Sequence, residues 1–312
     1  MTAQDMTSGI SKFVQDVNVL SVRVRSSIFM MNGFLPWPQN FYKQTSMTGG
    51  RPTCPKLGEK YFRMCLAARY SSSQWEHQGR TRTILSPNSS ARCWESTITE
   101  HTMVTSDHMT PEIRLRLITP LCPLWHHNTD HCPFSDPFWA FYWPGGQVLT
   151  RYILDNPHII KEKAVLDIGS GCGASAIAAV KGGARKVLAN DIDEVAAQAM
   201  RLNAALNGVE LEISTNNIIR ECAEHDETDH WDVVFLGDMF YDRDFIDRLS
   251  LWLNNLVRRN KCRVLIGDPG RQFLQGHPLQ ERLQKLYEVN LPANCIEENR
   301  GHSVGLVWEL VT

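Results

Sequence analysis

A regular alternation of apolar and amphipathic segments runs from residue 163 to residue 268 and restricts the fold more than any other feature of the sequence. The amphipathic segment ASAIAAVKGG separates the first two apolar segments, and DEVAAQAMRLNAALNG separates the second from the third. Strands that alternate with helices form a mostly parallel sheet covered on both faces, so we expect a Rossmann-like α/β fold. The apolar segments are KAVLDI (163–168), RKVLAND (185–191), VELEIST (209–215), WDVVFLGD (231–238) and CRVLIGD (262–268).

The C-terminal part of the chain predicts that a hairpin completes this sheet. Helices are expected at 243–258 and at 277–290. NCIEEN (294–299) and SVGLVWELV (303–311) then predict two strands that a short Arg-Gly turn joins into an antiparallel pair. The sheet would therefore have seven strands. Nearer the N-terminus, MTPEIRLRLITP (109–120) fits both a helix start and a strand and is left undecided.

Residues 1–97 differ in character from the rest of the chain. Up to Arg92 there are twelve basic residues and four acidic ones, and the segment YFRMCLAARYSSSQ (61–74) has the Arg-rich, Ser-rich composition of an organellar transit peptide. We expect residues 1–97 to be a basic, disordered region with a mitochondrial transit peptide, and residues 98–312 to form one domain. Because that segment lies far from Met1, either the presequence is long or the chain has an alternative start; a merely disordered tail is the other interpretation.

The composition excludes several classes of protein. A net charge of −2 supplies no basic field to attract nucleic acid, and charged residues interrupt every long apolar stretch, so no membrane insertion is expected. The nine cysteines form no CxxC pair, which favours a reducing compartment. CPLWHHNTDHC (122–132) lacks the paired spacings of structural zinc sites, and no metal is expected.

A glycine-rich turn follows the first strand of the alternation. It reads DIGSGCG (167–173), and glycines allow a tight turn and a close approach to a ligand at the N-terminus of the next helix. Asp167 precedes the glycines, which suits a ligand with an ammonium group better than a pyrophosphate. Asp191 ends the second strand, where a carboxylate can accept hydrogen bonds from ribose hydroxyls. These features favour S-adenosylmethionine; a nicotinamide cofactor and a purely structural turn are the alternatives.

Two motifs and six segments carry a resemblance to a known family. D-x-G-x-G-x-G with Asp191 resembles the seven-β-strand, class I methyltransferases, and GDMFYD (237–242) resembles their protein-methylating group, which has Asp-x-x-Tyr after the fourth strand. From residue 98 onward the chain is similar to a family of that group whose members methylate lysines of the electron transfer flavoprotein beta subunit in mitochondria. The segments are TPEIRLRLITP, SDPFWAFYWPGGQ, VLDIGSGCGASAIAA, LANDID, LGDMFYD and VLIGDPGR.

The resemblance implies a cofactor site built from residues of these motifs. The four residues of the glycine-rich turn would surround the methionine part of S-adenosylmethionine, Asp191 would hold the ribose, and Asn217 would lie near the adenine unless it is an ordinary turn residue. Trp143 and Gly145 would close over the cofactor. The cofactor-binding residues are thus Trp143, Gly145, Asp167, Gly169, Gly171, Gly173, Asp191 and Asn217.

Asp238 and Tyr241 are the candidate catalytic residues. A lysine amine, with an ordinary pKa of about 10.4, must lose its proton before it attacks a methyl group. A carboxylate can attract and orient the ammonium, and an aromatic ring can hold the cation. The alternative is that Asp238 caps the next helix and Tyr241 only packs. Asp268, in GDPGR (267–271), would either shape the acceptor groove or close a turn.

The sequence therefore predicts an S-adenosylmethionine-dependent protein-lysine N-methyltransferase. By the resemblance, it would methylate, and we expect trimethylate, lysines of the electron transfer flavoprotein beta subunit in the mitochondrial matrix, with the cytoplasm as a second location. Two alternatives stay open. The same scaffold could act on another protein or on a small amine, or it could be a catalytically silent cofactor-binding module that docks a partner.

Overall fold

A computed structural model describes residues 87–126, 132–219, 230–298 and 301–311. The possible transit segment and part of the Cys-His group at 122–132 lie outside these ranges. Within them, no helix is long and apolar enough to cross a membrane, and no three His, Cys, Asp or Glu residues gather as a metal site would require.

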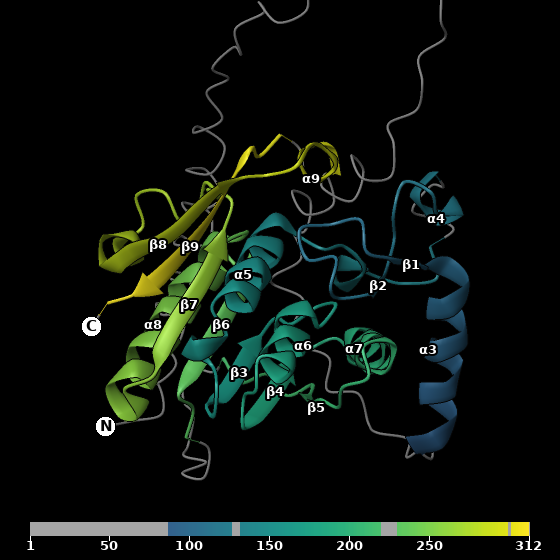
Figure 1. The fold of residues 1–312 in the computed structure, drawn as a ribbon, viewed down its shortest axis with the longest axis horizontal. Helices are drawn as coiled ribbons and strands as arrows, with labels where there is room; N and C mark the ends of the chain where they lie inside the picture. Colours follow the sequence, from purple (N-terminus) through teal and green to yellow (C-terminus); the bar gives the residue numbers. More distant parts are fainter. Residues whose placement is uncertain (1–86, 127–131, 220–229, 299–300, 312) are drawn as a thin grey trace, which may run out of the picture. The chain divides into compact units, whose positions relative to one another are not determined.

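A seven-stranded sheet forms the centre of the domain, which confirms the expected fold class (Figure 1). The strand order is β5-β4-β3-β6-β7-β9-β8. The first five strands are parallel, and β9 is antiparallel to both of its neighbours. The strands are β3 (Ala164–Ile168), β4 (Lys186–Asn190), β5 (Glu212–Ser214), β6 (Val233–Gly237), β7 (Arg263–Asp268), β8 (Leu283–Asn290) and β9 (Val304–Leu310).

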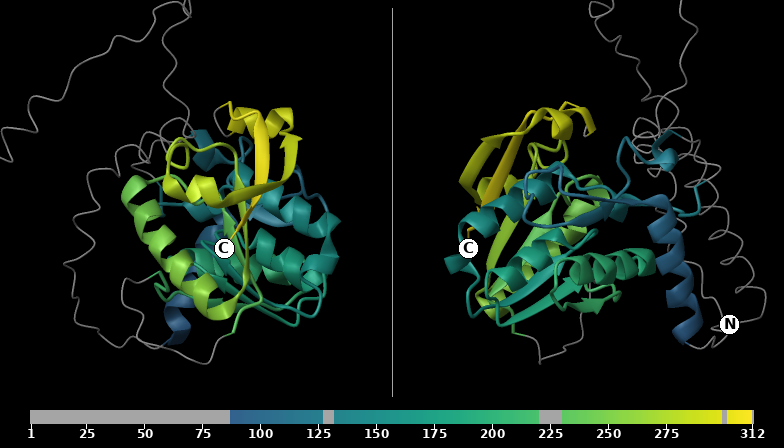
Figure 2. Two further views of the ribbon diagram at one scale, coloured as in Figure 1. Left: turned by 90° about the vertical axis from the view of Figure 1, so that its left-hand side faces the viewer. Right: turned by 45° about the vertical axis from the view of Figure 1, so that its right-hand side comes forward.

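Helices cover both faces of this sheet because successive strand residues point to opposite sides (Figure 2). Val165 of β3 and Phe235 of β6 pack in one core with the helices α5 (Pro144–Asp155), α6 (Ala174–Lys181) and α7 (Glu194–Leu206). Leu166 and Val234, which are adjacent to them in the sequence, face the opposite core. There they pack with α8 (Arg243–Asn260), whose buried residues are Ile246, Leu249, Leu253 and Val257.

The closing hairpin exists, but its first strand is not the one that we expected. Residues 283–290, expected as a helix, form β8 after the short 3₁₀ helix η7 (Pro278–Arg282), and β8 pairs with β9. A β-bulge between Lys285 and Tyr287 leaves Leu286 as an extra residue in the strand. The bulge therefore spaces Leu283, Leu286 and Tyr287 as on one face of a helix, which explains the wrong prediction.

The segment expected as the other hairpin strand is a helix. Residues 293–298 form α9 (Ala293–Glu298), and Ile296 N–H donates to the carbonyl of Pro292 at 3.0 Å, closing a helical turn. A short apolar pair such as Cys295 and Ile296 does not distinguish a strand from a helix.

The described N-terminal elements pack on the outside of α7. These elements are α3 (Pro87–His101), β1 (Met103–Thr105), β2 (Leu115–Leu117), α4 (Pro123–His126) and η5 (Phe138–Ala140). Ile98 and Trp139 share a core with Ala196 and Ala199 of α7. The boundary expected at residue 98 thus falls inside α3, and the undecided segment 109–120 contains strand β2.

Candidate active site

Acidic residues end four neighbouring strands at one edge of the sheet. Asp167 lies in β3, Asp191 directly follows β4, Asp238 directly follows β6, and Asp268 ends β7. The strands are parallel, so their carboxyl ends meet at this edge, where ligands bind in such folds. The structure therefore brings the expected cofactor turn and the expected catalytic acid to the same edge.

The glycine-rich turn has the backbone that its glycines allow. Gly169, Gly171 and Gly173 have φ angles of 62°, 53° and 82°, where a Cβ would be strained. Hydrogen bonds from Ser170 N to Asn190 O and from Gly171 N to Asp191 Oδ2, both 3.0 Å, hold the turn against the end of β4. The turn leads straight into α6.

Asp167 is a buried acid at the base of this turn. Its side chain accepts a hydrogen bond from Ser170 Oγ at 2.5 Å, and the residue is 2% exposed. Burial, with the charge of Asp191 acting in the same direction, raises the pKa of Asp167 to about 7. A bound cation would stabilise the ionised form, so the site suits a ligand with an ammonium group.

The end of β4 organises the next part of the edge. Asp191 Oδ1 accepts from Asp193 N at 3.0 Å, and since each carboxylate oxygen has two lone pairs, both oxygens can accept a further hydrogen bond. Asn190 Nδ2 donates to Ser214 O at 3.0 Å and to Asn216 O at 2.9 Å. These bonds fix the segment that carries Asn217, whose side chain is exposed.

The N-terminus of α5 lies directly on the ends of β6 and β7. A Cβ on Gly145 would fall 2.8 Å from Asp238 N, and one on Gly267 would fall 2.9 Å from the carbonyl carbon of Gly145. Atoms do not approach so closely, and backbone atoms cannot rotate away as a side chain can. Both glycines are therefore required for this contact between Gly145 and the ends of the two strands.

Asp238 caps α5 from a distant part of the chain. Gly145 N donates to Asp238 Oδ2 at 2.8 Å across 93 residues, whereas Trp143 at the N-cap position supplies no side-chain cap. The next helix, α8, is capped by Asp242, whose side chain accepts from Phe245 N. The alternative assignment of Asp238 as the cap of the next helix is therefore wrong.

The second oxygen of Asp238 is bonded to Arg271. Arg271 Nε donates to Asp238 Oδ1 at 2.6 Å, and the two side chains are 12% and 3% exposed. Asp238 also has φ of 61°, a left-handed conformation that is uncommon for any residue except glycine. Such backbone strain at a ligand-facing edge is typical of functional sites.

Tyr241 and Trp143 differ in their relation to this ion pair. Tyr241 is 55% exposed and stacks on Phe245, with ring centroids 5.5 Å apart. The ring of Trp143 lies beside the Arg271 guanidinium, 5.8 Å from centroid to Cζ, and its Nε1 donates to Phe138 O at 2.9 Å. The aromatic ring next to the buried charge pair is thus that of Trp143.

Asp268 closes the turn after β7. Its Oδ2 accepts from Gly270 N at 2.7 Å and from Arg271 N at 3.1 Å, which fixes the backbone of Arg271. Burial and the charge of Asp238 raise the pKa of Asp268 to about 7. Arg271 also lies 3.3 Å from His302 Nε2, and burial together with the guanidinium charge lowers the pKa of His302.

The close backbone contact of Gly267 with α5 was not predicted. A signal existed in the sequence, because the adjacent strands β6 and β7 both end in Gly-Asp and Gly237 pairs with Gly267 in register. Two small residues side by side at a strand end leave room for another backbone to cross. The consecutive glycines of WPGG (143–146) could supply that backbone at close range.

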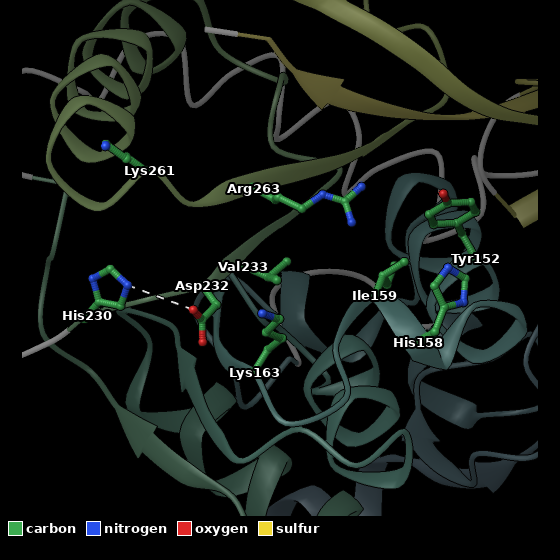
Figure 3. Close-up of a pocket in the computed structure, with 9 residues that line it drawn as sticks. All are labelled: Tyr152, His158, Ile159, Lys163, His230, Asp232, Val233, Lys261 and Arg263. Carbon is green, nitrogen blue, oxygen red and sulfur yellow. Dashed lines mark ion pairs between the residues drawn. The ribbon is translucent and has the colours of Figure 1, made fainter.

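A hollow lies at the opposite, amino edge of the same sheet and contains no residue that we assigned to the site (Figure 3). It has a volume of 660 Å³. Asp232 accepts from Ala164 N at 2.8 Å and lies 3.9 Å from His230, while Arg263 is bonded to Glu309 at 2.7 Å. The lining residues are Tyr152, His158, Ile159, Lys163, His230, Asp232, Val233, Lys261 and Arg263.

Comparison with known proteins identifies close relatives. A protein from Xenopus laevis named electron transfer flavoprotein beta subunit lysine methyltransferase is 46% identical over 247 residues, which cover 78% of this chain and 98% of the relative. The mouse protein of the same name is 50% identical over 212 residues, covering 67% of this chain and 81% of the relative. A Caenorhabditis elegans homolog is 39% identical over 226 residues, which cover 67% of this chain and 93% of the relative. The family model of ribosomal protein L11 methyltransferase (PrmA) matches residues 149–236.

Proposed function

The chain belongs to the family of electron transfer flavoprotein beta subunit lysine methyltransferases, and from this premise we propose that it methylates lysines of that beta subunit with S-adenosylmethionine as the methyl donor. The observation that carries the proposal is the pair of buried carboxylates, Asp167 and Asp238, on adjacent parallel strands. Each offers a negative charge to a cation, one to the ammonium of the cofactor and one to the lysine. Gly169 and Met239 lie in contact, which brings the cofactor turn next to the segment of Asp238.

The residues at the carboxyl edge fit S-adenosylmethionine. Asp167 and the turn Gly169–Gly173 suit the methionine part, Asp191 suits the ribose, and the segment of Asn217 suits the adenine. Trp143 and Gly145, at the start of α5, would close over the cofactor from the other side. When bound, S-adenosylmethionine supplies a methyl group on a positively charged sulfur, and that sulfur is the leaving group when a neutral amine attacks the methyl carbon in line.

The role proposed for Asp238 is to bind and orient the acceptor amine. Its carboxylate is buried and fixed by the α5 backbone, so the carboxylate itself need not move to hold a lysine by charge-assisted hydrogen bonds. Tyr241, on the exposed rim of the same loop, would contact the lysine on its way in and exclude water behind it. The lysine gives up a proton to the solvent before each attack, and the methylated nitrogen then carries the positive charge.

Intact-mass spectrometry tests the proposal. Purified electron transfer flavoprotein beta subunit, incubated with the enzyme and S-adenosylmethionine, should gain mass in steps of one methyl group, up to three per target lysine. Asp238→Asn keeps an oxygen for Gly145 N but removes the charge, so it should lose most turnover while calorimetry shows cofactor binding within a few-fold of wild type. Cofactor binding without any mass gain would instead support the silent docking module.

A mitochondrial matrix location is part of the same proposal. It is supported by the acid-poor, basic composition of the first ninety-two residues, with twelve basic and four acidic side chains. A fusion of residues 1–97 to a fluorescent protein should enter mitochondria in cultured cells. A diffuse cytoplasmic signal from that fusion would contradict this assignment.

A further inference from the structure

A cation of the protein itself occupies the position that the acceptor lysine would need. Arg271 Nε bonds Asp238 Oδ1 at 2.6 Å, and the guanidinium lies beside the face of Trp143. The other oxygen of Asp238 accepts from Gly145 N. Because the Asp238 side chain is only 3% exposed, the open route for a second cation to this charge is to take the place of the Arg271 side chain.

We propose that the acceptor site is the space between Asp238 and Trp143, that Arg271 holds it as an internal substitute for the substrate, and that the incoming lysine ammonium displaces Arg271. This inference rests on the proposed function and names the place where its substrate binds. The aromatic partner of the acceptor cation is then Trp143, and Tyr241 lies outside this site.

Electrostatics explains why such a site would keep a resident cation. A buried carboxylate that has lost its partner cation is strongly destabilising. Arg271 removes that penalty when no substrate is bound, and an exchange of one cation for another leaves the total charge at Asp238 unchanged. Displacement is therefore much less costly than opening an ion pair to leave it empty.

The same exchange distinguishes the substrate from the fully methylated product. A lysine ammonium has three N–H donors for the Asp238 carboxylate, whereas a trimethylated lysine has none. Arg271 keeps its Nε–H donor throughout. With each added methyl group, Arg271 should therefore compete better with the lysine for the Asp238 carboxylate. The return of Arg271 then favours release of the finished product.

Binding of a small lysine-like cation tests the exchange without any methyl transfer. N-butylammonium chloride is titrated against wild-type protein and Arg271→Gln, with binding followed by two-dimensional NMR of the backbone amides at Gly145 and Asp238. The variant should bind butylammonium at least fivefold more tightly than wild type. Arg271→Gln/Asp238→Asn should lose this gain, and Arg248→Gln, which alters an exposed arginine on α8, should match wild type.

Wild-type protein provides a second measurement in case Arg271→Gln folds poorly. The Nε–H resonance of Arg271 should move away from its ion-paired position as butylammonium is added, while that of Arg248 should not. Tetramethylammonium, which cannot donate a hydrogen bond, should displace Arg271 at least fivefold less effectively. An unmoved Arg271 signal at saturating butylammonium would overturn the proposal.

Kinetics then separates exchange from a purely positioning role. With the beta subunit as substrate, Arg271→Gln should lower KM several-fold and change kcat by less than that factor. A fall in kcat at constant KM, together with no gain in butylammonium binding, would show that Arg271 only positions Asp238. If wild-type enzyme transfers no methyl group to the beta subunit, the proposed function fails, and the cation titrations still decide whether Arg271 is displaced.

Discussion

The two edges of the same sheet carry charge in opposite ways. At the carboxyl edge, Asp167, Asp238 and Asp268 are 2%, 7% and 0% exposed and are held by a serine hydroxyl, by backbone amides or by the half-buried Arg271. At the amino edge, Lys163 and Lys261 are exposed around an open hollow. The hollow lies at the amino edge, yet the buried carboxyls whose pKa values are raised to about 7 lie at the carboxyl edge. Burial of fixed charge therefore indicates the chemistry better than hollow volume does.

The largest effect should come from filling the space between Gly145 and Gly267. Gly267→Ala places a Cβ 2.7 Å from Leu149 Cβ and against the Gly145 backbone, so the free energy of unfolding should fall by about 3 kcal/mol, measured by urea denaturation. Gly146→Ala is the matched control, because its Cβ would meet only Tyr142 at 3.6 Å. As a helical Gly→Ala change it should stabilise by about 0.5–1 kcal/mol. Equal stability of the two variants would show that the backbones of Gly145 and Gly267 are not in close contact.

Cofactor affinity should depend on pH through Asp167. Its pKa is raised to about 7 by burial, and an ammonium ligand binds the ionised form, so affinity is lost as pH falls through that value. Calorimetry should show S-adenosylmethionine binding about tenfold more weakly at about pH 5.5 than at about pH 7.0. Methylthioadenosine, which lacks the ammonium, should bind equally at both pH values. A flat profile for both ligands would mean that Asp167 does not face the ammonium.

At the amino edge, Asp232→Ala should have a purely structural effect. The variant loses the hydrogen bond to Ala164 N at the start of β3, so the free energy of unfolding should fall by about 1 kcal/mol. Cofactor affinity measured by calorimetry should stay within twofold of wild type. A larger loss of affinity would show that the two edges are coupled through β3.

The smallest effect should follow Lys163→Gln in the hollow of the amino edge. Its side chain is exposed, so thermal unfolding should shift by less than the equivalent of about 0.5 kcal/mol. Methylation of the beta subunit should proceed at the wild-type rate in the intact-mass assay. A severalfold slower reaction would mean that the amino edge takes part in substrate binding. The two edges would then not differ in function.

Local signals made most of the fold predictable. The strands β3 to β7 are short apolar segments bounded by turns, and α6, α7 and α8 carry clear amphipathic spacing, so residues near in sequence determine each element. The strand β8 could not be predicted in this way, because a bulge at Leu286 gives it the apolar spacing of a helix. What makes it a strand is its pairing with β9.

In the candidate site, too, local motifs were predictable from the sequence and long-range contacts were not. The turn from Asp167 to Gly173 is a compact motif, and the structure places it where the sequence indicated. The contacts of Asp238 are different, because Gly145 lies 93 residues away and Arg271 lies 33 residues away. No spacing rule connects such residues, so the sequence placed Asp238 at the edge but did not predict its bonds to Gly145 and Arg271.

The capping of α5 by Asp238 also has a consequence for synthesis of the protein. A ribosome completes the α5 segment long before it reaches residue 238, so the first turn of the nascent helix initially has no cap. The cap can form only once residue 238, which directly follows β6, has been synthesised. A nascent chain that lacks residue 238 therefore cannot complete the edge that faces the cofactor.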